Sequence, residues 1–336
     1  MTPVIVAAVL LLAAANGAND VSKGVATLAG SGVTRYRTAI AWGAGTTLVG
    51  AVASAWLGAG LLKLFSSGIV AARPTPAFAL AVLLGAGTWV GAATRWRLPM
   101  SSTHAIVGAL IGAGLLLDPR AVRWPALLGK VALPLLLSAV VAFAISALLG
   151  VLARAARRQV APVQPAPEPV YGGTTSAATA ARLATATTAA HWLSAGAVSA
   201  ARGLNDTPKL AAVGAVALVP VGMSSREITL LIGGAMGSAA LLAGGRVARR
   251  LGEDVVALSH DEGPRANLTT AVLVGAGAAY ALPMSTTHVA TGAIAGTSAQ
   301  NVRRLNLGTL RAFALVWTVT PLAAGLVAAA ALAVLR

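Results

Sequence analysis

Long apolar stretches follow one another along almost the whole chain, and short polar breaks separate them. Together with the positions of Gly, Pro and charged residues, these stretches predict twelve helical segments, six in each half. A membrane-spanning helix needs about 20 apolar residues. Four segments (20–33, 99–117, 206–221 and 284–300) are shorter or carry polar groups, so we expect a functional site there. The segments are 1–18, 20–33, 38–62, 77–94, 99–117 and 125–152, then 181–204, 206–221, 227–248, 267–282, 284–300 and 308–335.

A stretch of different composition joins the two halves. Residues 153–180 contain three arginines, four prolines and a run of Gly, Ser, Thr and Ala, which is typical of a solvent-exposed linker. We therefore expect a first transmembrane repeat at 1–152, this linker, and a second transmembrane repeat at 181–336. Residues 4–15 follow no basic stretch and have a counterpart in mid-chain, so we interpret them as part of a span and not as a cleaved signal peptide.

Two polar motifs occur once in each half, in the same order and at nearly the same distance apart. Asn19–Lys23 corresponds to Asn205–Lys209, and Leu98–His104 corresponds to Leu282–His288. This pattern predicts a tandem duplication of a six-segment unit. Matching interrupted segments in two halves are typical of a transporter binding site. Basic loops fall at different places in the two halves, which favours repeats of inverted topology.

The composition is that of an all-α polytopic membrane protein. The 336 residues are 57% hydrophobic and 10% charged, whereas a soluble domain has about 25% charged residues. Cys is absent, which excludes disulfides and thiolate metal sites. We interpret the net charge of +16 as loop charge under the positive-inside rule. No stretch is long enough for a soluble basic domain, so a nucleic-acid partner is not expected.

Ionisable residues stand inside two of the apolar segments. Asp20 and Asp206 are the acidic residues found there, and Lys23 and Lys209 follow each by three positions. An ionisable group at the membrane centre costs at least about 2.5–3.5 kcal/mol. Their symmetric placement therefore favours a role in binding or charge compensation, although buried Asp–Lys pairs that stabilise a helix break would also explain them.

Each of these motifs predicts a helix that breaks and restarts. Gly17 and Gly203 precede the Asn-Asp pairs and allow unwinding, and Asn and Asp prefer helix caps to helix interiors. Pro208 fits the first turn of a restarting helix. The freed N–H groups of such a break would suit an anion, and its carbonyls and carboxylate would suit a cation.

The second motif places three hydroxyl residues after a Pro-Met pair in each half. Pro99 and Pro283 end any preceding helix, so the hydroxyls are expected at a new helix N-terminus, where N–H groups and hydroxyls favour an oxyanion. Plain N-capping is the alternative, and the duplication favours anion binding. The hydroxyl residues are Ser101, Ser102 and Thr103 in the first half and Ser285, Thr286 and Thr287 in the second.

Neighbouring positions leave other chemistries open or unsupported. His104 and His288 are either proton-sensitive site groups or buried polar residues. No acidic partner or metal-ligand spacing accompanies them, so an enzyme and a metal centre are not expected. Gly108 with Gly112, and Gly292 with Gly296, indicate close helix contacts.

The duplicated motifs resemble the signature of the inorganic phosphate transporter (PiT) family, in its bacterial permease form. The resemblance covers about residues 10–300 and rests on Asn16–Val21, Arg202–Thr207 and the two Pro-Met-Ser-Ser/Thr-Thr-His stretches. It implies an inverted-repeat secondary transporter with broken helices and re-entrant hairpins. Such a protein would move phosphate by alternating access across the bacterial inner membrane, coupled to H⁺ or Na⁺, as a homodimer. A sulfate permease remains an alternative, because the family includes one, and so does an anion channel.

The resemblance also implies roles for individual residues. Asn19, Asp20, Asn205 and Asp206 would line the substrate and cation sites, with any Na⁺ near Asp20 and Asp206, and Ser101, Ser102, Thr103, Ser285, Thr286 and Thr287 would hold the oxyanion. No cofactor beyond the coupling ion is implied. Lys23 and Lys209 depart from the family pattern, since Na⁺-coupled members commonly have Asn there. We expect each ammonium group to occupy the place of a Na⁺ ion and to favour H⁺ coupling or exchange.

Overall fold

Helices account for almost all of the chain, as lipid requires of a backbone that must satisfy its own hydrogen bonds. The computed structural model describes residues 1–71, 75–159, 174–253, 255 and 258–336. The first half contains α1 (Thr2–Asp20), α2 (Ser22–Gly30), α3 (Tyr36–Leu57), α4 (Ala59–Lys63), α5 (Pro76–Arg95), α6 (Ser102–Leu117), α7 (Trp124–Ala126) and α8 (Leu133–Gln159). The second contains α9 (Thr174–Leu218), α10 (Ser225–Ala243), α11 (Gly245–Glu253), α12 (Glu262–Ala279), α13 (Thr286–Gly296) and α14 (Leu307–Leu335). Single π-helical or 3₁₀ turns lie at Leu64–Gly68, Pro119–Ala121, Leu127–Ala132 and Val302–Arg304.

Six helical stretches within the described residues are long and apolar enough to cross a membrane. Large apolar side chains on their outer faces are exposed, with Leu242 and Val334 each 87% accessible, as expected for surfaces that contact lipid. The chain is therefore an all-α polytopic membrane protein, as the composition predicts. The stretches are Thr2–Gly30, Tyr36–Leu57, Pro76–Arg95, Trp124–Ala156, Ser225–Ala243 and Leu307–Leu335.

The two Asn-Asp motifs differ in backbone structure. In the first half the helix is interrupted, because α1 ends at Asp20 and α2 begins at Ser22, but the predicted cap is wrong: Asn19 and Asp20 close α1, and no side chain caps α2. Val21 between them keeps right-handed helical angles (φ −57°, ψ −27°), so the chain does not change direction sharply.

The predicted break in the second half is wrong, because α9 continues through the motif and holds Pro208 in its interior. Asn205 does not cap a new helix, since its side-chain amide donates to the carbonyl of Met284 at 2.9 Å. Thr207 donates to the carbonyl of Gly203 at 2.7 Å within the same helix. The missing N–H of Pro208 removes one helical hydrogen bond, while the Thr207 bond within α9 and the tertiary bond of Asn205 are made in the turn around it.

Helices from one half pack against helices from the other. α1 packs on α10 and α9 packs on α3, while α6 packs on α14 and α13 packs on α8. A side chain at Gly108 would collide with the carbonyl of Pro321 on α14, and one at Gly292 would collide with the carbonyl of Ala139 on α8. The predicted close helix contacts at these glycines are confirmed, and each joins the two halves.

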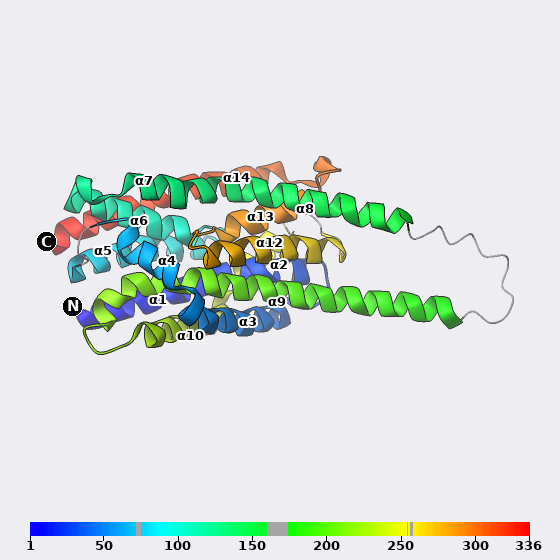
Figure 1. Cartoon of the computed structure of the whole chain (residues 1–336), viewed down its shortest axis with the longest axis horizontal. Coiled ribbons are helices and arrows are strands. Elements are labelled where there is room, and N and C mark those ends of the chain that lie inside the picture. The colour runs from blue at the N-terminus through cyan, green and yellow to red at the C-terminus, as the bar shows by residue number, and fades with distance from the viewer. Residues whose placement is uncertain (72–74, 160–173, 254, 256–257) are drawn as a thin grey trace.

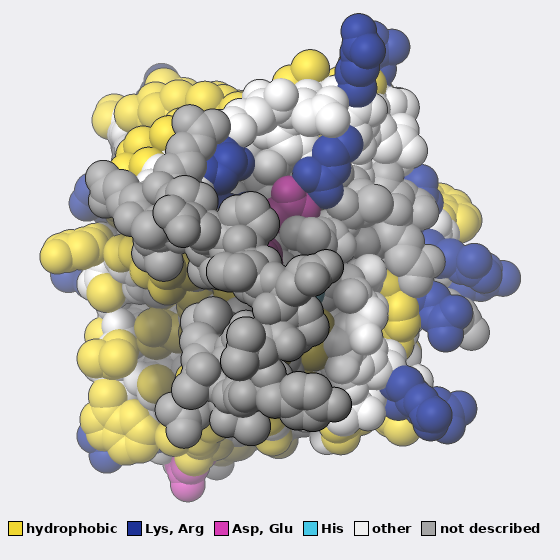
Figure 2. All heavy atoms as spheres, turned by 90° about the vertical axis from the view of Figure 1, so that its right-hand side faces the viewer, with side chains coloured by type: hydrophobic (Ala, Val, Ile, Leu, Met, Phe, Trp, Pro, Cys, Tyr) yellow, Lys and Arg dark blue, Asp and Glu magenta, His cyan; other side chains and the backbone are white. Residues whose placement is uncertain are grey.

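Figure 1 shows the course of the chain. α1 begins at the end of the molecule where both termini lie, and α9 runs in the opposite direction towards that end. α8 and α9 project beyond the other helices at the far end, so helix reaches Gln159 from one side and starts again at Thr174. Residues 160–173, the middle of the expected linker, lie outside the described residues. Viewed from this end, Lys and Arg side chains lie around the rim (Figure 2).

Candidate functional site

Both copies of both motifs meet in the interior of the bundle. The Asn-Asp motifs lie at the α1–α2 junction and in the middle of α9, and the hydroxyl motifs lie at the starts of α6 and α13. Asp20, Lys23, Asp206 and Lys209 are at most 2% exposed. Charged groups this deeply buried persist only when other charges or hydrogen bonds compensate them.

The first motif is organised around Asp20. Its carboxylate forms an ion pair with Lys23 through Oδ1. The Oδ2 atom accepts from Asn16 Nδ2 at 2.9 Å and from Ser102 Oγ at 2.8 Å. Lys23 Nζ also donates to Asn19 Oδ1 at 3.1 Å and lies 3.4 Å from the carbonyl oxygen of Met100. The ammonium group is thus surrounded by a carboxylate, an amide oxygen and a backbone carbonyl.

The second motif repeats this arrangement around Lys209. Its Nζ forms an ion pair with Asp206 Oδ1 at 3.1 Å. It also donates to Thr103 Oγ1 at 2.7 Å and to the carbonyl of Met284 at 3.2 Å. Asn205 Nδ2 donates to Asp206 Oδ1 at 2.8 Å, which fixes the carboxylate beside the ammonium group. Again three oxygen atoms of different kinds surround the nitrogen.

The hydroxyl residues connect the two motifs. Ser102 binds Asp20, and the next residue, Thr103, binds Lys209. Thr103 also donates to the carbonyl of Met284 at 3.2 Å, and Thr287 donates to the carbonyl of Met100 at 2.6 Å. Each helix start therefore holds the loop that precedes the other helix start. The two Asn-Asp motifs, far apart in the sequence, lie close together and away from solvent.

The same type of turn precedes each hydroxyl run. Arg97 and Ala281, at equivalent positions, adopt left-handed angles (φ 58° and 56°), and the N–H of the following leucine bonds back to the preceding helix. This is a Schellman-type helix end without its usual glycine.

The predicted helix starts are confirmed. Ser101 accepts from the N–H of His104 and Ser285 accepts from the N–H of His288, so both serines are N-caps. Thr286, the first residue of α13, is buried beside them. The capping alternative thus describes Ser101 and Ser285, while the hydroxyls of Ser102, Thr103 and Thr287 form tertiary contacts.

The two histidines of the repeated motif stack on each other. The ring centroids of His104 and His288 are 4.7 Å apart with an angle of 15° between the planes. Trp317 of α14 lies against His288 at 3.8 Å, and Nδ1 of His288 is 2.5 Å from Ser285 Oγ. Their equivalent positions in the repeats were the signal that could have predicted this contact.

Arg202 is a buried cation to which sequence reasoning gave no role. It precedes Asn205-Asp206 in the quoted motif and is 0% exposed. Its Nη2 donates to Thr47 Oγ1 of α3 at 2.8 Å, and its charge interacts with both Asp20 and Asp206. A positive charge within an apolar segment was the signal that could have identified it.

The residues present favour a small anion over a transition metal. Among the described residues no three His, Cys, Asp or Glu side chains are grouped to hold a metal ion. An alkali cation would need oxygen ligands, and one carboxylate oxygen of each motif is bonded to a lysine, Asp20 Oδ1 to Lys23 and Asp206 Oδ1 to Lys209. The site instead gathers ammonium, guanidinium and hydroxyl donors, which bind oxyanions.

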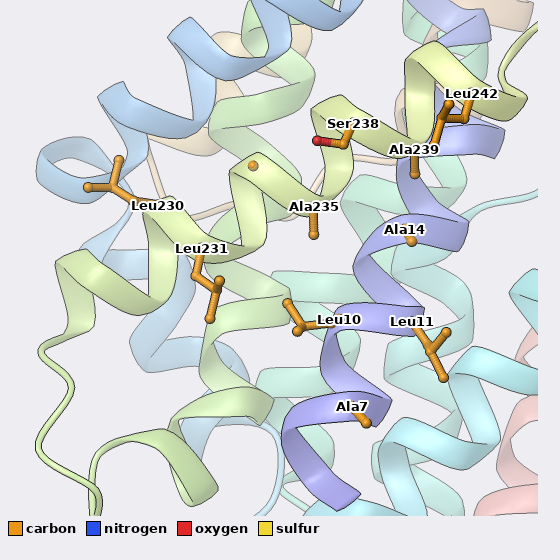
Figure 3. Close-up of a pocket in the computed structure, with 11 residues that line it drawn as sticks. Ala7, Leu10, Leu11, Ala14, Leu230, Leu231, Ala235, Ser238, Ala239 and Leu242 are labelled. Carbon is orange, nitrogen blue, oxygen red and sulfur yellow. The ribbon is translucent and has the colours of Figure 1, made fainter. Parts of the chain in front are cut away.

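A large groove elsewhere on the molecule is chemically different. It has a volume of about 770 Å³ and lies between α1 and α10 (Figure 3). Its lining is apolar apart from Ser238 and includes Leu11 and Leu242, which are widely exposed. None of the motif residues lines it, and its surface suits lipid chains and not an anion.

Comparisons with known proteins show the family of the chain. The model of the phosphate transporter family matches residues 16–328. The chain is 28% identical to a probable low-affinity inorganic phosphate transporter of Mycobacterium bovis, over 94% of this chain and 72% of that protein. It is 26% identical to a protein of the same description from Rhizobium meliloti, over 94% and 90%.

A solved structure of a protein described as the sodium-dependent phosphate transporter has the same fold. The TM-score is 0.85 at 22% identity, and the match covers 99% of this chain and 98% of that one. That family consists of transporters and not of enzymes. Because the family model spans nearly the whole chain, this protein belongs to the phosphate transporter family.

Proposed function

We propose that this protein is a secondary transporter that moves inorganic phosphate across the bacterial inner membrane as a homodimer. The observation that carries the proposal is the convergence of two polar motifs, each present in both halves, in the buried interior. Ten residues form the substrate site in this proposal: Asn19, Asp20, Ser101, Ser102, Thr103, Asn205, Asp206, Ser285, Thr286 and Thr287.

Phosphate suits this site for electrostatic reasons. The N-termini of α6 and α13 carry partial positive charge. Lys23 and Lys209 add full charges, and each is already held at hydrogen-bond distance from hydroxyl or carbonyl oxygens. An entering oxyanion would accept from the hydroxyls that now donate to protein oxygens, so these hydroxyl donors stay bonded when the anion binds.

The surroundings of Lys23 and Lys209 bear on which ion is coupled to transport. Each ammonium group sits among three oxygens, which is the ligand type that an alkali cation would need. We propose that the fixed ammonium groups take the place of Na⁺, so that transport is coupled to H⁺ or runs as exchange. The sodium dependence of the structural relative is a property of that protein. Uptake that requires Na⁺ at constant pH would contradict this assignment.

Alternating access would use the two halves as moving parts. We propose that residues 1–152 and 181–336 are inverted repeats joined by the 153–180 linker. Support comes from the opposite directions of α1 and α9 (Figure 1). The pairs α5–α6 and α12–α13 would be re-entrant hairpins whose loops carry the hydroxyl motifs. Rocking of the halves would then expose the site to each side in turn.

Uptake of radiolabelled phosphate into proteoliposomes containing the purified protein tests the proposal. We expect saturable uptake that Asp20→Asn abolishes, because Asp20 holds both Lys23 and Ser102. Asp118→Asn is the matched control, since Asp118 is exposed at the end of α6. Absence of phosphate uptake by the unmodified protein would refute phosphate transport. Competition by sulfate would identify a sulfate permease, and failure of counterflow would identify a channel.

A further inference from the structure

The two repeats differ in charge at a buried position of the Asn-Asp motif. Asn16 in the first repeat corresponds to Arg202 in the second, each four residues before its aspartate. Asn16 Nδ2 donates to Asp20 Oδ2 at 2.9 Å. Arg202 makes no such bond to Asp206 and donates to Thr47 instead. The duplicated framework thus places an additional buried cation in the second repeat.

Polar atoms of Arg202 and Asp206 lack partners although both side chains are buried. Within the part of the chain that the structure describes, Nε and Nη1 of Arg202 and Oδ2 of Asp206 have no hydrogen-bond partner. Residues four apart on a helix lie on the same face, about 5–6 Å apart at Cβ. Both side chains therefore extend from the same face of α9 and their charges interact, and leaving these buried donors and this buried acceptor unbonded costs free energy.

The charges of the site point the same way. Lys23 and Lys209 are paired with Asp20 and Asp206. Arg202 interacts with both aspartates but is the third cation beside two carboxylates. The cluster therefore carries an excess positive charge that an anion would neutralise.

We propose that Arg202 and Asp206 form an oxyanion subsite that recognises a protonated tetrahedral anion. The free N–H groups of Arg202 donate to bare anion oxygens, and Oδ2 of Asp206 accepts from an acidic hydroxyl of the anion. Inorganic phosphate carries at least one hydroxyl near neutral pH, whereas sulfate has only acceptor oxygens. The subsite therefore selects phosphate over sulfate, which makes Arg202 a binding residue and Asp206 Oδ2 a specificity determinant. This inference rests on the proposed transport of phosphate.

Proteoliposome uptake with Arg202→Asn tests the donor. The variant should fold, since Asn16 stands at the equivalent position of the first repeat and would bond to the aspartate in the same way. We expect the KM for phosphate to rise at least about tenfold, because a charge-assisted contact is lost. Arg202→Lys keeps the charge without the fork of donors and should give an intermediate KM. Arg303→Asn removes the same charge from an exposed turn and serves as the control.

Competition between phosphate and sulfate tests the acceptor. Displacement of radiolabelled phosphate bound to the purified protein gives both inhibition constants without requiring transport. In Asp206→Asn the amide would offer a donor where the carboxylate accepts, so the ratio of the sulfate to the phosphate inhibition constant should fall at least about tenfold. This ratio does not depend on the amount of folded protein. An unchanged ratio, or a wild-type KM in both Arg202 variants, would overturn the inference and leave phosphate transport standing. Loss of phosphate uptake by the unmodified protein would instead refute the proposed function.

Discussion

Replacing Lys23 by Asn tests whether the ammonium group substitutes for a cation. Lys23 Nζ is bonded to Asp20, to Asn19 Oδ1 at 3.1 Å and to the carbonyl of Met100 at 3.4 Å. Asn is shorter and uncharged, so these three oxygens would lose their common donor, and the carboxylate of Asp20 would lose its compensating charge. Asn16 and Ser102 would still donate to the other oxygen of Asp20.

The size of the effect follows from the burial of the pair. Removing one partner of a fully buried ion pair costs about 3–5 kcal/mol. Since Asp20 is 0% exposed, the Lys23→Asn protein should unfold at a clearly lower temperature in choline buffer. If Na⁺ then enters the oxygen cluster, it stabilises the folded state by about 2.7 kcal/mol at 100 times its dissociation constant. Sodium should thus recover most of the lost stability.

Thermal unfolding of the purified protein in Na⁺ and in choline at equal ionic strength measures this difference. The unmodified protein should show the same midpoint in both buffers, and Lys23→Asn should show a midpoint that rises with Na⁺ concentration. Lys63→Asn, at an exposed position, controls for the loss of a lysine charge. Stabilisation of the unmodified protein by Na⁺, together with no response of Lys23→Asn, would refute the argument.

Three further predictions concern stability. The carboxylate of Glu262 accepts from Arg304 at 2.7 Å and from the N–H of Ser259. Burial alone would raise the pKa of this carboxyl. The two hydrogen bonds outweigh burial and hold the pKa below the usual 4.5. The pair therefore stabilises the protein above about pH 4.5 and loses this effect as pH falls through the lowered pKa. Glu262→Gln should lower the free energy of unfolding by up to about 1 kcal/mol at pH 7, and the variant and the unmodified protein should be equally stable in acid. Gly292→Ala should cost about 1–3 kcal/mol in thermal unfolding by pushing α13 off α8, and an unchanged melting temperature would contradict the close approach. Ala281→Gly should raise stability by about 1 kcal/mol because it relieves a left-handed alanine, and a lower melting temperature would argue against that turn.

Local chemistry explains which parts of the fold were predictable. The starts of α6 and α13 follow from Pro99 and Pro283 with a serine soon after, since a proline ends one helix and a hydroxyl caps the next. The close contacts at Gly108 and Gly292 follow from the spacing of small residues in apolar segments.

Long-range contacts explain what the sequence did not reveal. Asn205 does not cap a helix because its side-chain amide bonds to the carbonyl of Met284, a partner 79 positions away. Without that contact Asn-Asp before a proline predicts a cap, so local preference pointed to a break. Nor does the sequence show that Thr47 of α3 accepts from Nη2 of Arg202 alone and leaves Nε and Nη1 without partners.

The reciprocal bracing of the halves makes each half depend on the other. The glycine face of α6 is covered by α14, and that of α13 is covered by α8, so each cover comes from the opposite half. In one half alone, the glycine face that now packs against backbone carbonyls of the other half would be uncovered. If a half existed as a separate chain, it would therefore need a second copy of itself to cover this face.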